Sequence, residues 1–136
     1  MPTVRAVELP SLATSSTTPS SVGTSYSTSK VLTFSIPKAA TDAALNFHYL
    51  YVKCSSISST TKITMYICSD AAGDEIIIPE SEADITVGTT TATKGTAGWA
   101  IGVPGSGEAT TLYAFIKGDA GTFTAASAYL TYDAHA

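Results

Sequence analysis

Short runs of alternating apolar and polar residues, separated by turn residues, constrain this chain more than any other feature. The clearest runs are KVLTFSI at 30–36, KITMYICS at 62–69 and TFTAASAYLTY at 122–132. Such alternation predicts β-strands, because successive strand residues face opposite sides of a sheet. Pro37 and Pro79 each end a run, as expected of a residue without an N–H to donate to a neighbouring strand.

Eight strands are expected in this 136-residue chain. They lie at 30–36, 45–54, 62–69, 75–78, 83–87, 97–103, 110–117 and 122–132. The composition agrees, since the chain has 22 Thr, 17 Ser and no Gln, and the β-branched Thr side chain fits a pleated surface. We therefore expect an all-β, two-sheet sandwich, a jelly roll of about eight strands.

The first 29 residues differ from the rest. Residues 11–29 contain thirteen Ser or Thr, and ahead of them lies the short apolar strip VRAVELP. We interpret residues 1–29 as an extended N-terminal arm and residues 30–136 as the sandwich domain. A disordered terminus and a first strand packed on its own domain remain alternatives. The arm hypothesis predicts that a chain without residues 1–28 folds but attaches to its partner more weakly.

Two of the expected strands are apolar on both faces. In 45–54, Leu50 and Val52 alternate with aromatic residues, and in 110–117 Tyr113 and Phe115 alternate with aliphatic ones. A sandwich buries only one face of each strand, so the second face needs a loop, the arm or a neighbouring subunit as cover. We favour a subunit. The candidate partner interface comprises Val4, Arg5, Val7, Leu9, Leu50, Val52, Tyr113 and Phe115.

Six of the eleven acidic residues fall within fifteen positions and have no cation between them. They are Asp70, Asp74, Glu75, Glu80, Glu82 and Asp84. A solvated acidic rim, an edge that meets basic side chains of a partner and a calcium site are the alternatives, although the spacing is not that of a calcium-binding loop. We treat these six as a candidate acidic contact rim. Glu80 and Glu82 also suit a sheet edge protected from self-pairing.

The chain has two cysteines, Cys54 and Cys68, and their spacing relative to its two histidines fits no zinc pattern. We interpret them as ordinary strand thiols. A hairpin between 45–54 and 62–69 that turns near Thr61 would place Cys54 opposite Cys68, within reach of a disulfide.

The charge pattern excludes several classes of function. The net charge is −4 and the basic residues are scattered singly, which argues against nucleic-acid binding. No apolar run approaches the roughly 18 residues of a membrane helix. MPTVRAVELP has no apolar signal core, so we expect synthesis in a reducing cytoplasm without export.

Catalytic motifs are missing from the sequence. It has no G-x-S-x-G elbow, and the Gly-rich GVPGSGEATT at 102–111 lacks the Lys-Ser/Thr of a phosphate loop. His48 lies in the middle of a strand and is interpreted as structural, and Trp99 as a core residue. We expect no catalytic residue, cofactor or metal. A sugar-stacking platform that includes Tyr26, Tyr113 or Tyr129 is an alternative role for surface aromatics.

The final segment, LYAFIKGDAGTFTAASAYLTYDAHA at 112–136, is similar to the closing strand pair of small bacteriophage virion proteins. The likeness lies in a hydrophobic strand, D-A-G-T, an alternating strand and L-T-[WY]. It is carried by Tyr113, Phe115, Asp119, Ala120, Gly121, Thr122, Ala128, Leu130, Thr131 and Tyr132. The Ser/Thr-rich N-terminus and LTFSIPK also resemble phage decoration (cement) proteins of the jelly-roll kind.

This resemblance implies a non-enzymatic protein of the capsid surface, made in the host cytoplasm. Its partners would be the major capsid protein and two further copies of itself, in a homotrimer, with no nucleic acid and no membrane. It would stabilise junctions between capsid subunits. A jelly roll also implies that most consecutive strands cross between sheets, which places Cys54 and Cys68 on opposite sheets and conflicts with the hairpin register above. The alternatives are a tail-fibre or baseplate module that binds a host receptor or glycan, and, third, an enzyme.

Overall fold

The computed structural model describes residues 11–37, 44–85, 91–102 and 110–135. The side chains at 11, 44–46, 91–102 and 133–135 are not described. All regular structure in the described residues is β-structure. None of these residues belongs to a helix long and apolar enough to cross a bilayer.

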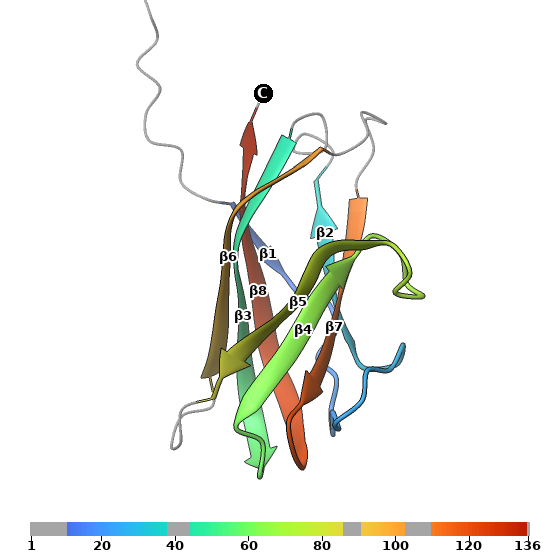
Figure 1. Cartoon of the computed structure of the whole chain (residues 1–136), viewed down its shortest axis with the longest axis vertical. Helices are drawn as coiled ribbons and strands as arrows, with labels where there is room; N and C mark the ends of the chain where they lie inside the picture. Colours follow the sequence, from blue (N-terminus) through green and yellow to red (C-terminus); the bar gives the residue numbers. More distant parts are fainter. Residues whose placement is uncertain (1–10, 38–43, 86–90, 103–109, 136) are drawn as a thin grey trace, which may run out of the picture.

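Two four-stranded antiparallel sheets face each other as two layers (Figure 1). The first has the order β1-β8-β3-β6 and the second has the order β2-β7-β4-β5. The strands are β1 (Ser11–Thr14), β2 (Val31–Ile36), β3 (Ala44–Ser58), β4 (Lys62–Cys68), β5 (Ile76–Asp84), β6 (Thr91–Gly102), β7 (Thr110–Gly118) and β8 (Thr122–His135). The predicted all-β, two-sheet sandwich is confirmed.

The connections between strands make this sandwich a jelly roll. Of the consecutive strands, only β4 and β5 pair with each other, and every other consecutive pair lies in different sheets. This includes β7 and β8, so the closing strands are neighbours in sequence but not hydrogen-bonded partners. Two four-stranded sheets joined by crossing connections are the arrangement expected of this fold.

The described residues contain eight strands, the predicted number, although the members differ. Most of the run expected at 75–78 and the start of the run expected at 83–87 form one strand, β5, residues 86 and 87 lie outside the described residues, and β1 is an additional strand that the Ser/Thr-rich composition concealed. Pro79 lies inside β5, which is an edge strand with a register shift between Met65 and Ile67 of its partner. An edge tolerates proline because one side of the strand has no ladder to complete.

The core lies between the sheets, and its largest fully buried side chains include Phe34, Phe47 and Phe123. A β-bulge at His48, between Phe47 and Tyr49, changes the alternation of β3. Phe47 therefore points inward together with Leu50 and Val52, which are 1% and 0% exposed. Assigning Leu50 and Val52 to a partner interface was wrong, because the extra residue of a bulge moves all later side chains to the other face.

The two cysteines are free and buried, Cys54 on β3 and Cys68 on β4. The predicted hairpin between these strands is wrong: β3 pairs with β6 and β8, whereas β4 pairs with β5 and β7. The opposite-sheet placement implied by the jelly roll is confirmed. Burial raises the pKa of each thiol to about 11, which keeps both protonated at neutral pH.

Of the predicted arm, the described part, residues 11–29, packs against the sandwich. β1 pairs with β8, and Val22 is fully buried and exchanges backbone hydrogen bonds of 2.7 and 3.1 Å with Phe123. The Ala125 N–H donates to the carbonyl of Pro19 at 2.9 Å. For residues 11–29 this is the alternative of a first strand packed on its own domain.

Candidate functional site

The outer face of the β1-β8-β3-β6 sheet carries an open groove of about 400 Å³. It is lined by Leu12, Tyr49, Tyr51, Tyr129 and Thr131, and we call it the tyrosine groove. Leu12 is 58% exposed and Tyr49 is 54% exposed. Exposed large apolar side chains that gather in one place make the groove a candidate contact surface.

The strand register explains how the groove forms. Tyr51 of β3 lies opposite Tyr129 of β8, with ring centroids 6.0 Å apart and planes at 37°. Tyr49 lies opposite Thr131, whose Oγ1 accepts the Tyr49 N–H at 3.0 Å, and Leu12 of β1 pairs with Thr131 from the other side. The lining residues thus come from three hydrogen-bonded strands. The bulge at His48 places Tyr49 and Tyr51 on the outer face of the sheet.

The chemistry of the groove favours apolar occupants. Its five lining residues offer aliphatic carbon and aromatic faces, and the polar groups of their side chains are hydroxyls. Among the side chains that the structure describes, no charged group or carboxamide lines it. Aliphatic side chains and cations that settle on aromatic faces suit such a surface, whereas sugar binding usually adds charged or amide groups that fix the ligand's orientation.

Part of the outer face of the β2-β7-β4-β5 sheet, around Phe115, is covered by the chain itself. Phe115 is 2% exposed and stacks on Tyr66 of β4, with centroids 5.1 Å apart and planes at 6°. A Cβ added at Gly73, in the β4–β5 turn, would meet the Phe115 ring at 3.0 Å. The cover expected from a subunit is thus a loop here, and assigning Phe115 to the partner interface was wrong. Tyr113, on the same strand, is half-buried.

Tyr26 fastens the segment before β2 to this same face. Its ring meets Tyr66 edge-on at 4.7 Å, and Lys117 Nζ lies 4.6 Å from its centroid. Its hydroxyl donates a 2.6 Å hydrogen bond to Glu80. Burial, then this hydrogen bond and the charge of Glu80, raise the pKa of Tyr26 above its usual range. Tyr26, Tyr113 and Tyr129 therefore form no common platform, since Tyr129 belongs to the other sheet.

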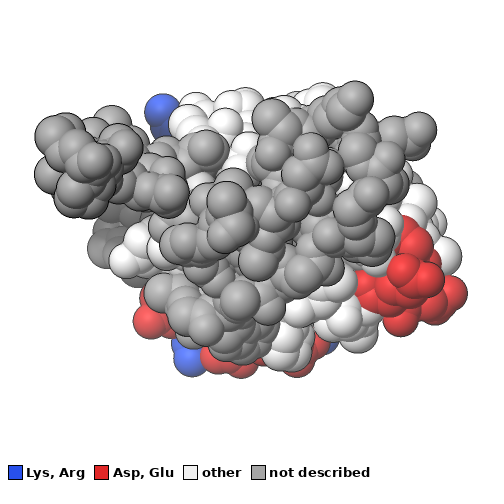
Figure 2. Space-filling view, turned by 90° about the horizontal axis from the view of Figure 1, so that it is seen from above, with Lys and Arg blue, Asp and Glu red and all other residues white. Residues whose placement is uncertain are grey.

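Half of the predicted acidic rim builds the β4–β5 turn. The Asp70 carboxylate accepts the N–H groups of Glu75 at 2.8 Å and Asp74 at 3.2 Å, and these bonds, the one from Glu75 first, lower its pKa. Glu75 accepts a 2.8 Å hydrogen bond from Ser69. Within the described residues no three metal-ligating side chains come together. Figure 2 shows acidic side chains gathered on the side where the β4–β5 turn projects in Figure 1.

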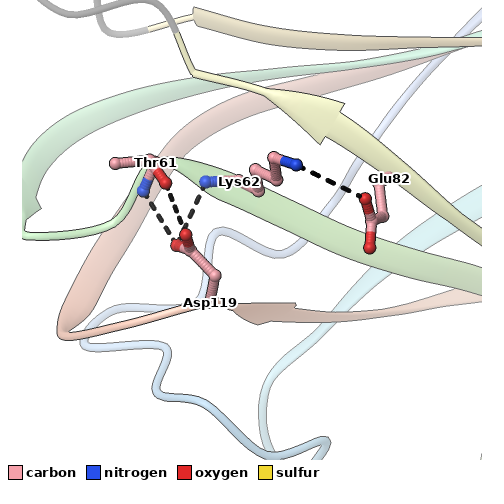
Figure 3. Close-up of polar contacts among 4 residues, drawn as sticks. All are labelled: Thr61, Lys62, Glu82 and Asp119. Carbon is pink, nitrogen blue, oxygen red and sulfur yellow. Dashed lines mark hydrogen bonds and ion pairs between the residues drawn. The ribbon is translucent and has the colours of Figure 1, made fainter.

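The other half of the rim lies on β5, the edge strand of its sheet, where Glu80, Glu82 and Asp84 are exposed. Lys62 Nζ approaches Glu82 to 3.9 Å, and both side chains are at least half exposed (Figure 3). Such a pair contributes about 0–1 kcal/mol. The rim is therefore two structures, a hydrogen-bonded turn and a charged sheet edge.

The D-A-G-T motif ties the β7–β8 turn to the β3–β4 connection. The Asp119 carboxylate accepts the Thr61 N–H at 2.8 Å, the Lys62 N–H at 3.1 Å and the Thr61 hydroxyl (Figure 3). These bonds, the hydroxyl first, lower the pKa of Asp119 to about 2. Gly121 has a φ of 62°, and a Cβ there would lie 1.7 Å from the Ser58 carbonyl oxygen. The motif thus has a structural task.

The described members of the predicted interface do not form one surface. Val4, Arg5, Val7 and Leu9 lie outside the described residues, as does the side chain of Trp99. The tyrosine groove is a site that sequence reasoning missed. Alternation alone grouped Tyr49 and Tyr51 with Phe47 and left Leu12 inside a low-complexity stretch. The signal available was the aromatic pair Tyr49 and Tyr51, spaced by two on one strand.

Comparisons with protein-family models, with curated proteins and with solved structures find no match to this chain.

Proposed function

We propose that this protein is a non-enzymatic structural component of a bacteriophage virion, a homotrimer that binds the outside of the capsid and stabilises junctions between major capsid subunits. The resemblance of residues 112–136 to phage virion proteins motivates the proposal. The observation that carries it is the tyrosine groove, an apolar surface on a sandwich whose other sheet is partly covered by its own chain, around Phe115.

The distribution of exposed apolar residues supports an assembly role. Among the described residues, three large hydrophobic side chains are exposed, and two of them, Leu12 and Tyr49, lie in the tyrosine groove. Burying apolar area stabilises an assembly by roughly 25 cal/mol per Å². On a capsid, this added area would resist the outward pressure of packaged DNA without any chemistry on a substrate.

The acidic contact rim would set the orientation in which the protein docks on the capsid subunit. The exposed carboxylates of β5 and of the β4–β5 turn would meet basic side chains of the capsid subunit and orient its docking. Association that depends on these charges would weaken as salt rises, because exposed charges are screened beyond about 8 Å at physiological ionic strength.

A tail-fibre or baseplate module that binds a receptor or glycan is the second candidate. The exposed ring of Tyr49 beside Tyr51 and Tyr129 favours it, because aromatic faces stack on sugar rings. The described side chains of the lining include no charged or amide group, which disfavours it. Glycan-array binding by the purified protein would support this candidate, and the variant Tyr49→Ser would then lose the binding.

Copy number in purified virions of the phage that encodes the chain tests the proposal. Quantitative mass spectrometry would compare the protein with the major capsid protein. We expect many copies in a simple ratio to the capsid subunit, because a protein seated on a symmetric lattice repeats with it. A handful of copies would indicate a location in the tail, and absence of the protein from virions would overturn both candidates.

A further inference from the structure

We propose that the tyrosine groove of one copy binds residues 5–9 (RAVEL) of a neighbouring copy. This inference rests on the proposed assembly into a homotrimer and identifies the contact that would hold its subunits together. Residues 1–10 lie outside the described part of the chain, so the reasoning starts from their sequence and from the place where they join the sandwich.

The groove has the size and chemistry for a short extended segment. Its two rows, Tyr51 with Tyr129 and Tyr49 with Thr131, are two residues apart along the strands, or about 7 Å. From Leu12 on β1 across β8 to Tyr49 on β3 there are two strand spacings, or about 10 Å. Two or three side chains fill such a surface.

The N-terminal strip supplies side chains of that kind and spacing. In an extended segment Arg5, Val7 and Leu9 point to one side, about 7 Å from one to the next. Val7 and Leu9 are apolar and suit Leu12 and the tyrosine rings. A guanidinium such as that of Arg5 is attracted to a tyrosine face, and in the same chain Lys117 already lies over the ring of Tyr26.

The strip joins the sandwich beside the groove. It continues into Ser11, the first residue of β1, and the next residue, Leu12, lines the groove. β1 is an edge strand, paired with β8 alone among the described strands. Ten residues precede it, and an extended chain of that length reaches about 30 Å, which is enough to cross a subunit boundary.

The local sequence directs the strip to another copy and away from its own groove. Leu9 precedes Pro10, so its backbone is restricted to extended conformations, and from Ser11 onward the chain is already a strand. A reversal onto the same groove would have to fall within residues 4–8, VRAVE. That stretch has no Gly, Pro, Asn, Asp or Ser, the residues that form turns.

Exchange of these segments closes a ring. Each copy gives one strip and receives another, so the contact joins two different surfaces, and repeated contacts of this kind form a closed ring when the rotation fits. Three copies would complete the proposed trimer. No pre-formed pocket is needed in the donor, because an extended segment takes its shape on docking.

Photo-crosslinking of the full-length protein tests this inference. The photoreactive residue p-benzoylphenylalanine replaces Val7, and the control protein carries it at Glu8, which points to the opposite side of an extended strip. Unlabelled and ¹⁵N-labelled copies are mixed before illumination, and mass spectrometry then identifies the joined peptides. We expect crosslinks from position 7 to the peptides that contain Leu12, Tyr49, Tyr51 or Tyr129, in products that join one labelled and one unlabelled chain.

Two further variants distinguish a specific effect of the groove on crosslinking from a general loss of folding. Tyr49→Ser should lower the yield from position 7 about tenfold, because an exposed aromatic anchor carries much of a contact's affinity. Ile76→Ser, on the other sheet, where Ile76 is 56% exposed, should leave the yield unchanged. Crosslinks confined within single chains, crosslinks to other peptides, equal yields from positions 7 and 8, or no crosslinks at all would overturn the inference.

This outcome is independent of the test of the proposed function. The crosslinking uses purified protein alone, whereas copy number is measured in virions. Strip exchange in a protein that is absent from virions would leave the inference standing and remove the capsid role. Copy number in a simple ratio to the capsid subunit, without strip exchange, would support the capsid role and overturn the inference.

Discussion

At the scale of a single residue, Gly121 shows why only glycine fits at this position of the D-A-G-T turn. Its φ is 62°, and an added Cβ would lie 1.7 Å from the Ser58 carbonyl oxygen. Backbone atoms cannot move aside as the end of a flexible side chain can. The turn between β7 and β8 therefore requires glycine for both conformation and space.

We predict that Gly121→Ala destabilises the fold by about 2–4 kcal/mol, at the severe end of single substitutions. The matched control is Gly23→Ala, where an added Cβ meets nothing within 4 Å, and which should stay within about 0.5 kcal/mol of the parent. Urea unfolding followed by circular dichroism measures both free energies. Equal stability of the two variants would contradict the role assigned to Gly121.

Asp119 makes the stability of the same turn depend on pH. Hydrogen bonds from the Thr61 hydroxyl and from the N–H groups of Thr61 and Lys62 lower its pKa from 3.8 to about 2. A carboxyl whose pKa is lower in the folded protein adds stability above its unfolded pKa. That stability is lost as the pH falls through the folded pKa.

We predict that Asp119→Asn lowers the free energy of unfolding at pH 7, since an amide NH₂ cannot accept the Thr61 hydroxyl proton. The difference between parent and variant should shrink as the pH falls from about 4 to about 2, where the parent's carboxylate becomes protonated. Urea unfolding at pH 7, 4 and 2 measures this difference. A gap that stays constant over the whole range would show that the charge of Asp119 contributes nothing.

At the scale of elements, segments that belong to no strand cover part of the outer face of the β2-β7-β4-β5 sheet. Tyr26 from the segment before β2 lies on Tyr66, and the β4–β5 turn lies on Phe115. The hydrogen bond from Tyr26 to Glu80 then joins the first of these segments to β5. Loops have thus taken the place that a partner would occupy on this sheet.

We predict that Tyr26→Phe destabilises the protein by about 0.5–1.5 kcal/mol at pH 7, through loss of this hydrogen bond. Because the pKa of Tyr26 is raised by folding, its contribution is complete below about pH 10 and is lost as the pH rises further. The parent should therefore lose stability in alkali more steeply than the variant. Thermal unfolding between pH 8 and 11 tests this, with Tyr129→Phe as the control. Parallel curves for parent and Tyr26→Phe would contradict the prediction.

At the scale of the whole molecule, the Ser/Thr-rich N-terminal segment completes the sandwich. β1 extends the first sheet, Val22 covers Phe123, and the Gly118 N–H donates to the carbonyl of Gly23 at 2.8 Å. The hydroxyl of Ser15 donates to the Thr17 carbonyl at 2.7 Å and accepts the Thr33 N–H at 3.0 Å. Hydrogen bonds of hydroxyl side chains thus help to hold in place a segment that buries few apolar side chains.

We predict that a chain without residues 1–28 loses cooperative thermal unfolding, contrary to the expectation attached to a free arm. It would lack β1, the hydrogen bonds to β8 and the burial of Val22, which alone contributes about 1.5 kcal/mol. A chain without residues 1–10 retains β1, its pairing with β8 and the buried Val22, and should keep a cooperative transition. Near-ultraviolet circular dichroism during heating distinguishes the two. A sharp transition in the shorter chain would restore the free-arm interpretation.

The sequence by itself determined the fold class of this protein and most of its strands. Alternating side chains, turn residues and a Thr-rich composition are local properties of the sequence. They predict where the strands lie and which residues of a strand share a face. The jelly-roll arrangement was also within reach, because a sandwich of this size has few ways to connect eight strands.

Only the tertiary structure decided which residues are outside. The bulge at His48 is a property of the pairing of β3 with β6 and β8, and it moved Phe47 inward and Tyr49 outward. The cover on the outer face of the other sheet comes from Tyr26, which meets Tyr66, and from Gly73, which lies against Phe115, and both are far from β7 in the sequence. Register and packing join distant parts of the chain. The alternation of a single strand therefore predicts two faces, but which of them meets the core depends on its neighbours.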